Sequence, residues 1–307
     1  MLLVPTLHLP AMAAAAGIKL TWEDFSDLSN IIPLLTRIYP NGSADVNQFH
    51  AAGGLSFIIK ELLENGLLDG SAASVWGKTI KDYASEPILK DGKLVWRAAP
   101  PNSSDLSILR PINKPHQPNG GLKMLSGNLG KAVIKISAVS KNNRVITAPA
   151  QVFSNEADVK IAYNNGELNK DVVVVVLAQG PQANGMPELH SLTPILANLQ
   201  DKGFKVALVT DGRMSGASGK IPAAIHVFPE AVNGGNIGRI KNGDIITVDA
   251  TSGKLEVKEK ISNRAPFSIT SKANPNSFGR SLFAQMRSQS ANAEAGGGIS
   301  INLGQNK

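Results

Sequence analysis

The chain has 307 residues, 42% hydrophobic and 18% charged, a balance that excludes a disordered chain and favours two domains over one. Its net charge of +7 comes from 31 scattered Lys and Arg residues without a basic run interleaved with aromatics, so we expect no nucleic-acid partner. No stretch approaches the roughly 20 apolar residues that cross a bilayer, so we expect no membrane partner.

The N-terminal residues 1–18 are apolar and alanine-rich, which raises the question of a signal peptide. They lack a basic start, and His8 interrupts the apolar run, so we expect a cytoplasmic protein. The chain contains no cysteine. It therefore has no disulfide framework, no cysteine nucleophile and no thiolate ligand for zinc or iron.

The first hundred residues read mainly as helix. Apolar positions 55, 58, 59, 62 and 63 form one helical face, and Gly66 supplies the stop. Residues 98–121 then become rich in Pro, Asn, Ser and Gly, a composition that indicates a linker or a long irregular connection.

Short segments rich in β-branched residues follow and are typical of strands. They comprise residues 132–136, 145–148, 172–178, 206–210, 244–248 and 254–257, the last two flanking a hairpin turn at 251–253. Further helices are predicted at 156–166, 190–199 and 278–289. The expected class is mixed α+β, with a helical first part and a β-rich second domain.

Three glycine-punctuated segments stand out, at residues 125–131, 179–188 and 210–220, and the last two directly follow predicted strands. Loops at the ends of strands often carry function. The third segment, which contains Ser215, matches neither the hydrolase elbow motif nor the phosphate-loop motif. Taken alone, it can therefore also be interpreted as a tight surface turn. Glu188 is either an oxygen ligand for a hard cation or a solvated acid near a helix start.

Taken together and in this order, the segments resemble the dihydroxyacid and sugar-acid dehydratase family. Within it, the chain looks most like the 6-phosphogluconate dehydratases over nearly its whole length. The resemblance includes Lys131-Ala132-Val133-Ile134-Lys135, the run 217–226, Trp22-Glu23-Asp24-Phe25-Ser26-Asp27 and Tyr39-Pro40-Asn41-Gly42.

This resemblance implies a hydro-lyase that dehydrates 6-phospho-D-gluconate to 2-keto-3-deoxy-6-phosphogluconate in the Entner-Doudoroff pathway. It implies an iron–sulfur cluster as Lewis acid at the C3 hydroxyl and a divalent cation, Mg or Mn, at the substrate's carboxylate end. Ser215 matches the serine that acts as an alkoxide base at C2, and Glu188 matches a cation ligand. The implied partners are a small anionic sugar acid and further copies in a homo-oligomer.

The chain departs from the family because the cluster cysteines and further acidic ligands belong to an N-terminal region that is not in this sequence. We therefore expect a truncated polypeptide that is inactive alone. The implied fold is the helical tail of an α/β first domain (1–105), a linker (106–120) and a swivelling β-barrel-like domain with flanking helices (121–307). The alternatives are a non-catalytic binding or assembly module, and a dehydratase for another sugar acid or dihydroxy acid.

The phosphate end of such a substrate requires cationic or backbone donors. Lys220 follows Ser218 and Gly219, whose small side chains allow backbone N–H groups to approach an anion. We therefore predict Lys220, Arg213 and Ser218 as substrate-binding residues, although a lysine on a solvated turn would give the same pattern.

Overall fold

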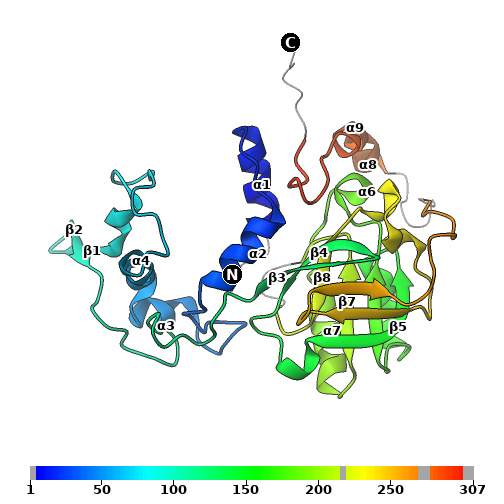
Figure 1. The fold of residues 1–307 in the computed structure, drawn as a ribbon, viewed down its shortest axis with the longest axis horizontal. Helices are drawn as coiled ribbons and strands as arrows, with labels where there is room; N and C mark the ends of the chain where they lie inside the picture. The colour runs from blue at the N-terminus through cyan, green and yellow to red at the C-terminus, as the bar shows by residue number, and fades with distance from the viewer. Residues whose placement is uncertain (1–4, 215–218, 269–276, 300–307) are drawn as a thin grey trace, which may run out of the picture. The chain divides into compact units, whose positions relative to one another are not determined.

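The chain folds into two units in the computed structural model, which describes residues 5–214, 219–268 and 277–299 (Figure 1). The barrel unit contains Met1–Asp27 and Leu122–Lys307, and the inserted unit contains Leu28–Gly121. The division of the sequence at residues 105 and 120 remains a prediction.

Eight strands of the barrel unit form a closed barrel, which confirms the mixed α+β class with a barrel-like sheet. Around the barrel they follow the order β10, β3, β4, β8, β7, β6, β5, β9. Strands β5 to β8 pair in parallel with one another, and β9 and β10 form the expected antiparallel hairpin. Their bounds are β3 (Leu122–Gly127), β4 (Gly130–Lys135), β5 (Val145–Phe153), β6 (Val172–Val176), β7 (Val206–Thr210), β8 (Ala223–Phe228), β9 (Ile245–Asp249) and β10 (Lys254–Val257).

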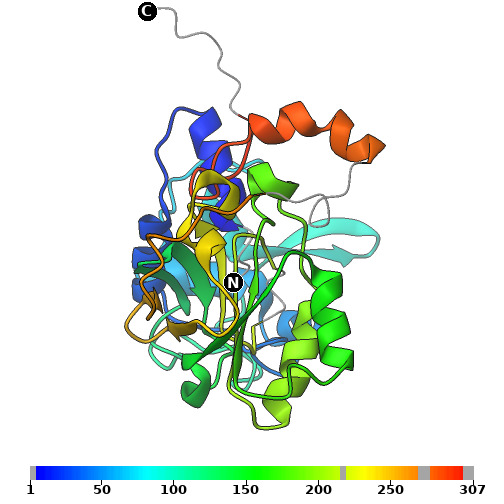
Figure 2. The same cartoon turned by 90° about the vertical axis from the view of Figure 1, so that its right-hand side faces the viewer.

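The parallel strands are buried on both faces, which explains why β6 is a run of five valines. Val173 and Val175 point into a core that receives side chains from all eight strands. Val172, Val174 and Val176 face outward and join a second core with the helices α5 (Glu156–Asn164) and α7 (Leu192–Asp201). Figure 2 shows these two helices side by side against the outside of the barrel.

The remaining helical elements of the barrel unit are short, apart from the two N-terminal helices. They are α1 (Pro5–Ala15), α2 (Trp22–Ile31, which continues into the inserted unit), α6 (Pro181–Asn184), α8 (Phe278–Leu282), α9 (Ala284–Ser288) and the 3-10 turns η2 (Lys141–Asn143), η3 (Ala231–Asn233) and η4 (Asn236–Arg239). The prediction of one helix over 278–289 is wrong, because Phe283 ends α8 and precedes α9. The longest described helices have 11 residues, and none is long and apolar enough to cross a membrane.

The N-terminal segment belongs to the barrel unit through packing and charge. Leu7, Trp22 and Phe25 are buried in the outer core, and the Trp22 indole N–H donates to the Thr6 carbonyl at 2.9 Å. The Lys131 ammonium on β4 contacts the Glu23 carboxylate at 2.9 Å and the side-chain carboxylate of Glu294, near the C-terminus, at 2.8 Å. Strand β4 is thus tied to chain segments from both ends of the sequence.

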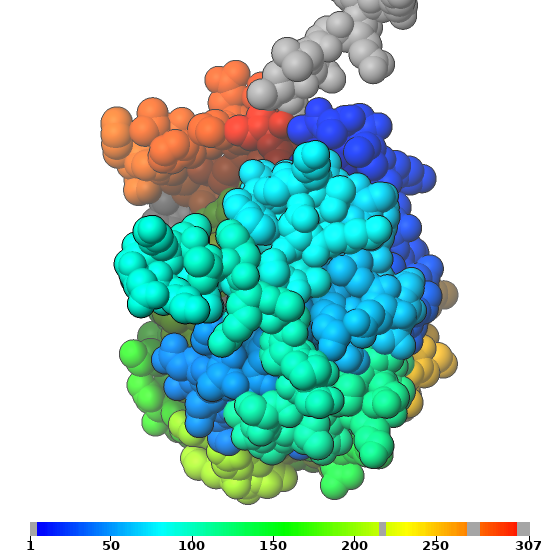
Figure 3. All heavy atoms as spheres, turned by 90° about the vertical axis from the view of Figure 1, so that its left-hand side faces the viewer, coloured from blue at the N-terminus to red at the C-terminus, as the bar shows by residue number. Residues whose placement is uncertain are grey.

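The inserted unit contains α3 (Val46–Ala51), α4 (Gly54–Glu64), η1 (Ile80–Ala84) and a hairpin of β1 (Ser85–Lys90) and β2 (Lys93–Ala98). Figure 3 shows part of its surface, coloured along the chain from blue through cyan to blue-green. The α4 helix confirms the helix predicted from positions 55 to 63. The hairpin corrects the expectation that the first hundred residues are mainly helical. It was missed because buried and exposed residues do not alternate along β1 and β2, so the sequence lacks the usual strand pattern there. Residues 99–121 contain neither helix nor strand, in agreement with an irregular connection.

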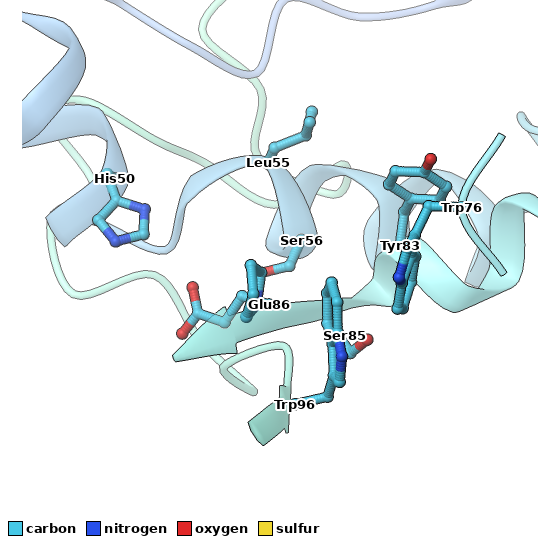
Figure 4. Close-up of a pocket in the computed structure, with 9 residues that line it drawn as sticks. His50, Leu55, Ser56, Trp76, Tyr83, Ser85, Glu86 and Trp96 are labelled. Atoms are coloured by element: carbon cyan, nitrogen blue, oxygen red, sulfur yellow. The ribbon is translucent and has the colours of Figure 1, made fainter. Parts of the chain in front are cut away.

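A cavity of about 270 Å³ lies within the inserted unit beside the hairpin (Figure 4). Trp76 stacks on Trp96 with 3.7 Å between ring centroids and meets Tyr83 edge-on at 5.5 Å. The Glu86 carboxylate on its wall already accepts from Arg97, at 2.8 Å from Nε. None of the site residues predicted from the sequence lines this cavity.

Candidate functional site

The loops that follow parallel strands β6, β7 and β8 lie at one edge of the barrel, because the carboxyl ends of parallel neighbours share an edge. The 179–188 loop after β6 and residues 210–214 after β7 lie at this edge, whereas Gly219 and Lys220 precede the amino end of β8. Ser215 and Ser218 lie outside the described residues. Residues 179–188 and 210–214 directly follow β6 and β7, as predicted from the sequence.

Glu188 and Arg213, predicted as a cation ligand and a substrate-binding residue, are neighbours. Arg213 Nη1 lies 3.4 Å from the Glu188 carboxylate, while Arg213 Nε donates to the Met186 carbonyl at 2.7 Å. The Leu189 N–H donates to the Arg213 carbonyl at 3.0 Å, so the backbones of the two loops also pair. With about a third of each side chain exposed, the ion pair is long and accessible, and a ligand could exchange with it at little cost.

Two buried carboxylates that sequence reasoning did not find connect the loops. The oxygens of Asp211 accept the backbone N–H groups of Ala178, Gln179 and Ala231 at 2.8 to 3.1 Å. Burial raises the pKa of Asp211 to about 6, and these hydrogen bonds only partly oppose it. Glu230 accepts the N–H groups of Gln182 and Ala183, both at 3.1 Å, and burial raises its pKa as well.

Non-glycine residues in the left-handed region also concentrate at this edge. They are Ala178 (φ 61°), Met186 (φ 52°) and His226 (φ 59°); the fourth in the described part of the chain is Asp91, in the β1–β2 turn. Such conformations persist where surrounding contacts enforce them, and they are frequent at functional sites. Their positions after β6 and within β8 support a functional assignment for this edge.

His226 is fully buried on β8 and borders the site loop. Its backbone N–H donates to the Gly212 carbonyl at 2.9 Å, and its ring Nδ1 lies 3.5 Å from the Thr6 hydroxyl. Burial, and secondarily the positive charge of Arg213, lower the pKa of His226 to about 3. The ring is therefore neutral, and its burial indicates a structural role.

Lys220 is exposed and forms no ion pair with any residue that the structure describes. It follows the buried Gly219 in a turn before β8. This placement fits an anion-binding lysine and a solvated lysine equally.

The first glycine-punctuated segment has a structural role as the turn between β3 and β4. A Cβ on Gly127 would lie 2.2 Å from the Leu255 carbonyl oxygen, and one on Gly130 would lie 2.2 Å from that of Phe228. The Asn128 side-chain amide also donates to the Val257 carbonyl at 2.7 Å and accepts the Val257 backbone N–H at 2.8 Å. The glycines therefore permit close approach of neighbouring strands rather than contact with a ligand.

Comparison with known proteins connects these features to a family. The family model for the dihydroxy-acid/6-phosphogluconate dehydratase C-terminal region matches residues 107–297, and that for the N-terminal region matches residues 5–83. The phosphogluconate dehydratase of Pseudomonas aeruginosa is 52% identical over 293 residues, covering 95% of this chain and 48% of that protein. Its counterpart in Escherichia coli is 49% identical over 294 residues, with coverage of 95% and 49%.

A dihydroxy-acid dehydratase from Sulfurisphaera tokodaii is more distant, at 39% identity over 265 residues, 84% of this chain and 45% of that protein. The chain spans about half the length of these curated relatives. Because the C-terminal family model covers more than half of the sequence, the assignment does not depend on any single relative. The chain belongs to the dihydroxy-acid/6-phosphogluconate dehydratase family.

Proposed function

We propose that this chain supplies the C-terminal part of a 6-phosphogluconate dehydratase, which converts 6-phospho-D-gluconate to 2-keto-3-deoxy-6-phosphogluconate. The observation that carries the proposal is the 52% identity to a phosphogluconate dehydratase over 95% of the chain, against 39% over 84% for the dihydroxy-acid dehydratase. The reaction removes a proton from C2 and hydroxide from C3, which leave together as water. The resulting enol becomes the 2-keto acid.

Ser215 is the proposed base that takes the C2 proton. A serine hydroxyl ionises only where positive charge favours the alkoxide. Arg213 is two residues earlier in the same loop, and its guanidinium is held by the Met186 carbonyl and Glu188. The loop therefore carries a fixed cation close in sequence to the proposed base.

Glu188 is the proposed ligand for a divalent cation, which would neutralise the carboxylate of the substrate. Its accessible carboxylate is a suitable hard-oxygen ligand. The described residues contain no group of three or more His, Asp and Glu side chains that could hold a metal ion. Glu188 would accordingly contribute one ligand to a site whose other ligands come from elsewhere.

The iron–sulfur cluster of the family does not fit this chain's own residues. Cluster iron is held mainly by cysteine thiolates, and the sequence contains no cysteine. We therefore propose that the activity requires a further polypeptide region carrying the cluster ligands, and that the chain is inactive by itself. The cytoplasm is the proposed location, and the complete enzyme is proposed to be a homo-oligomer.

The phosphate of the substrate is proposed to lie near Lys220, with Arg213 and Ser218 as further donors. Lys220 is exposed and its ammonium forms no ion pair within the described ranges, so it is available to an anionic group. The Lys220 ammonium is on a flexible stem and can follow a terminal phosphate, whereas Arg213 would donate from a guanidinium held by Met186 and Glu188.

Complementation tests this function. The chain would be produced together with the upstream region of the Pseudomonas aeruginosa relative, and formation of the 2-keto acid from 6-phosphogluconate would be measured. We expect turnover with both polypeptides and none with either alone. Turnover by the purified chain alone would refute the requirement for a further region. Preference for another sugar acid or a dihydroxy acid would refute the proposed substrate.

A further inference from the structure

Asp211 and Glu230 are two buried carboxylates at the site edge without a place in the proposed chemistry. Their exposed fractions are 0% and 4%, so neither can touch a substrate. Within the described ranges, neither forms an ion pair with Lys, Arg or His. Burying an ionisable side chain without an opposite charge costs folding stability, so the groups that these two carboxylates bind need to be identified.

The hydrogen-bond partners of these carboxylates are backbone groups of three separate loops. Asp211, after β7, accepts the N–H groups of Ala178 and Gln179 after β6 and of Ala231 after β8. Glu230, after β8, accepts the N–H groups of Gln182 and Ala183 after β6. Two side chains therefore fasten three loops whose strands are already neighbours in the sheet.

The loop after β6 is shaped around these carboxylates. A Cβ added at Gly180 would lie 2.2 Å from Glu230 Oε2, so the backbone approaches the carboxylate as closely as glycine allows. Ala178, whose N–H donates to Asp211 at 3.1 Å, is in the left-handed region at φ 61°. Because hydrogen bonds to ionised groups are stronger than neutral ones, Asp211 can hold this unfavourable conformation.

The fastened loops are those of the proposed site. Asp211 is four residues before Ser215 and two before Arg213, while Gln179 begins the loop that leads to Glu188. We propose that Asp211 and Glu230 are positioning residues that hold the first residues of the loops after β6, β7 and β8 in one arrangement, and thereby set the geometry between Arg213 and Glu188. Their functional significance rests on the proposed function, whereas the fastening of the loops does not.

The direct test is amide hydrogen exchange in the full chain, resolved by residue. Asp211→Asn keeps the shape but places an amide donor among backbone donors, so at least one of three hydrogen bonds is lost. We expect exchange at Ala178, Gln179 and Ala231 to accelerate by about tenfold or more, with no change in the β9–β10 hairpin. Asp244→Asn is the matched control, since Asp244 is also buried in the barrel unit but pairs with Arg264.

The proposal would be overturned if the exchange rates of the three amides in Asp211→Asn stayed within about threefold of the parent rates. It would also be overturned if Asp244→Asn changed these rates equally. Should Asp211→Asn fail to fold, Glu230→Gln provides the same test at Gln182 and Ala183. In the complemented enzyme, Asp211→Asn should lower kcat by about tenfold or more while KM changes little. An unchanged kcat would overturn the positioning role, whereas an inactive parent enzyme would refute only the proposed function and leave the exchange result decisive.

Discussion

The buried carboxyl of Asp211 predicts an unusual pH dependence of stability. Burial raises its pKa from 3.8 to about 6 in the folded chain, so the folded state holds the proton more tightly than the unfolded state. Between these values the contribution of Asp211 to the unfolding free energy falls as pH rises. The difference in pKa corresponds to about 3 kcal/mol of stability, present below about pH 4 and lost above about pH 6.

Asp211→Asn removes this titration, because an amide does not ionise. The variant should lose a constant amount of stability from its altered hydrogen bonds. Relative to the parent, however, it should gain about 3 kcal/mol as pH rises from about 3 to 7. Titrations of groups that do not interact with Asp211, including His226, largely cancel in this difference, whereas the variant removes the Asp211 charge that helps to raise the pKa of Glu230.

Urea unfolding at several pH values measures the difference. Fluorescence of buried Trp22 reports on the barrel unit, since Trp76 and Trp96 belong to the inserted unit. Asp244→Asn is a control for which the pH dependence of the stability difference should have the opposite sign. Burial opposes ionisation of Asp244, but the hydrogen bonds and charge of Arg264 outweigh it and hold the pKa of that carboxyl below its usual range. A parent-minus-variant difference for Asp211→Asn that stays flat within about 0.5 kcal/mol would refute the reasoning.

Two further substitutions test the proposed ligand contacts. Glu188→Gln should weaken Mn²⁺ binding by the complemented enzyme, because a charged oxygen ligand is removed; titration curves that coincide with the parent would make Glu188 a loop residue only. Lys220→Met should raise KM for 6-phosphogluconate while leaving kcat and the use of unphosphorylated gluconate nearly unchanged. Equal losses for both substrates would assign Lys220 a general structural role in its loop.

Much of the fold could be predicted from local sequence, because the barrel strands and α4 have clear patterns of burial. The valine run of β6 is buried on both faces, and the apolar positions of α4 repeat with a helical period. The β1–β2 hairpin could not be predicted in this way, since most of its side chains are exposed and β1 contains Pro87, a residue that argues against a strand. The break at Phe283 likewise lacks a glycine or proline signal.

The site was only partly predictable. The resemblance to the family indicated Glu188 and Arg213, and the structure brings these residues together. Ser215 and Ser218 lie outside the described residues, and the roles of all the predicted site residues remain proposals. Asp211 and Glu230 could not be found from sequence, because their partners are backbone N–H groups up to 48 residues away. An acid directly after a buried strand, as in Thr210-Asp211-Gly212, was the one available signal.

The base role of Ser215 is the central chemical claim, and the kcat of Ser215→Ala in the complemented enzyme tests it most directly. A base acts in the transition state, so kcat should fall by about a hundredfold or more while KM for 6-phosphogluconate changes little. Ser218→Ala removes a hydroxyl from the same loop; as a proposed phosphate donor, Ser218 should affect KM, so this variant should keep most of the parent kcat. A Ser215→Ala enzyme that retains most of its kcat would contradict the account.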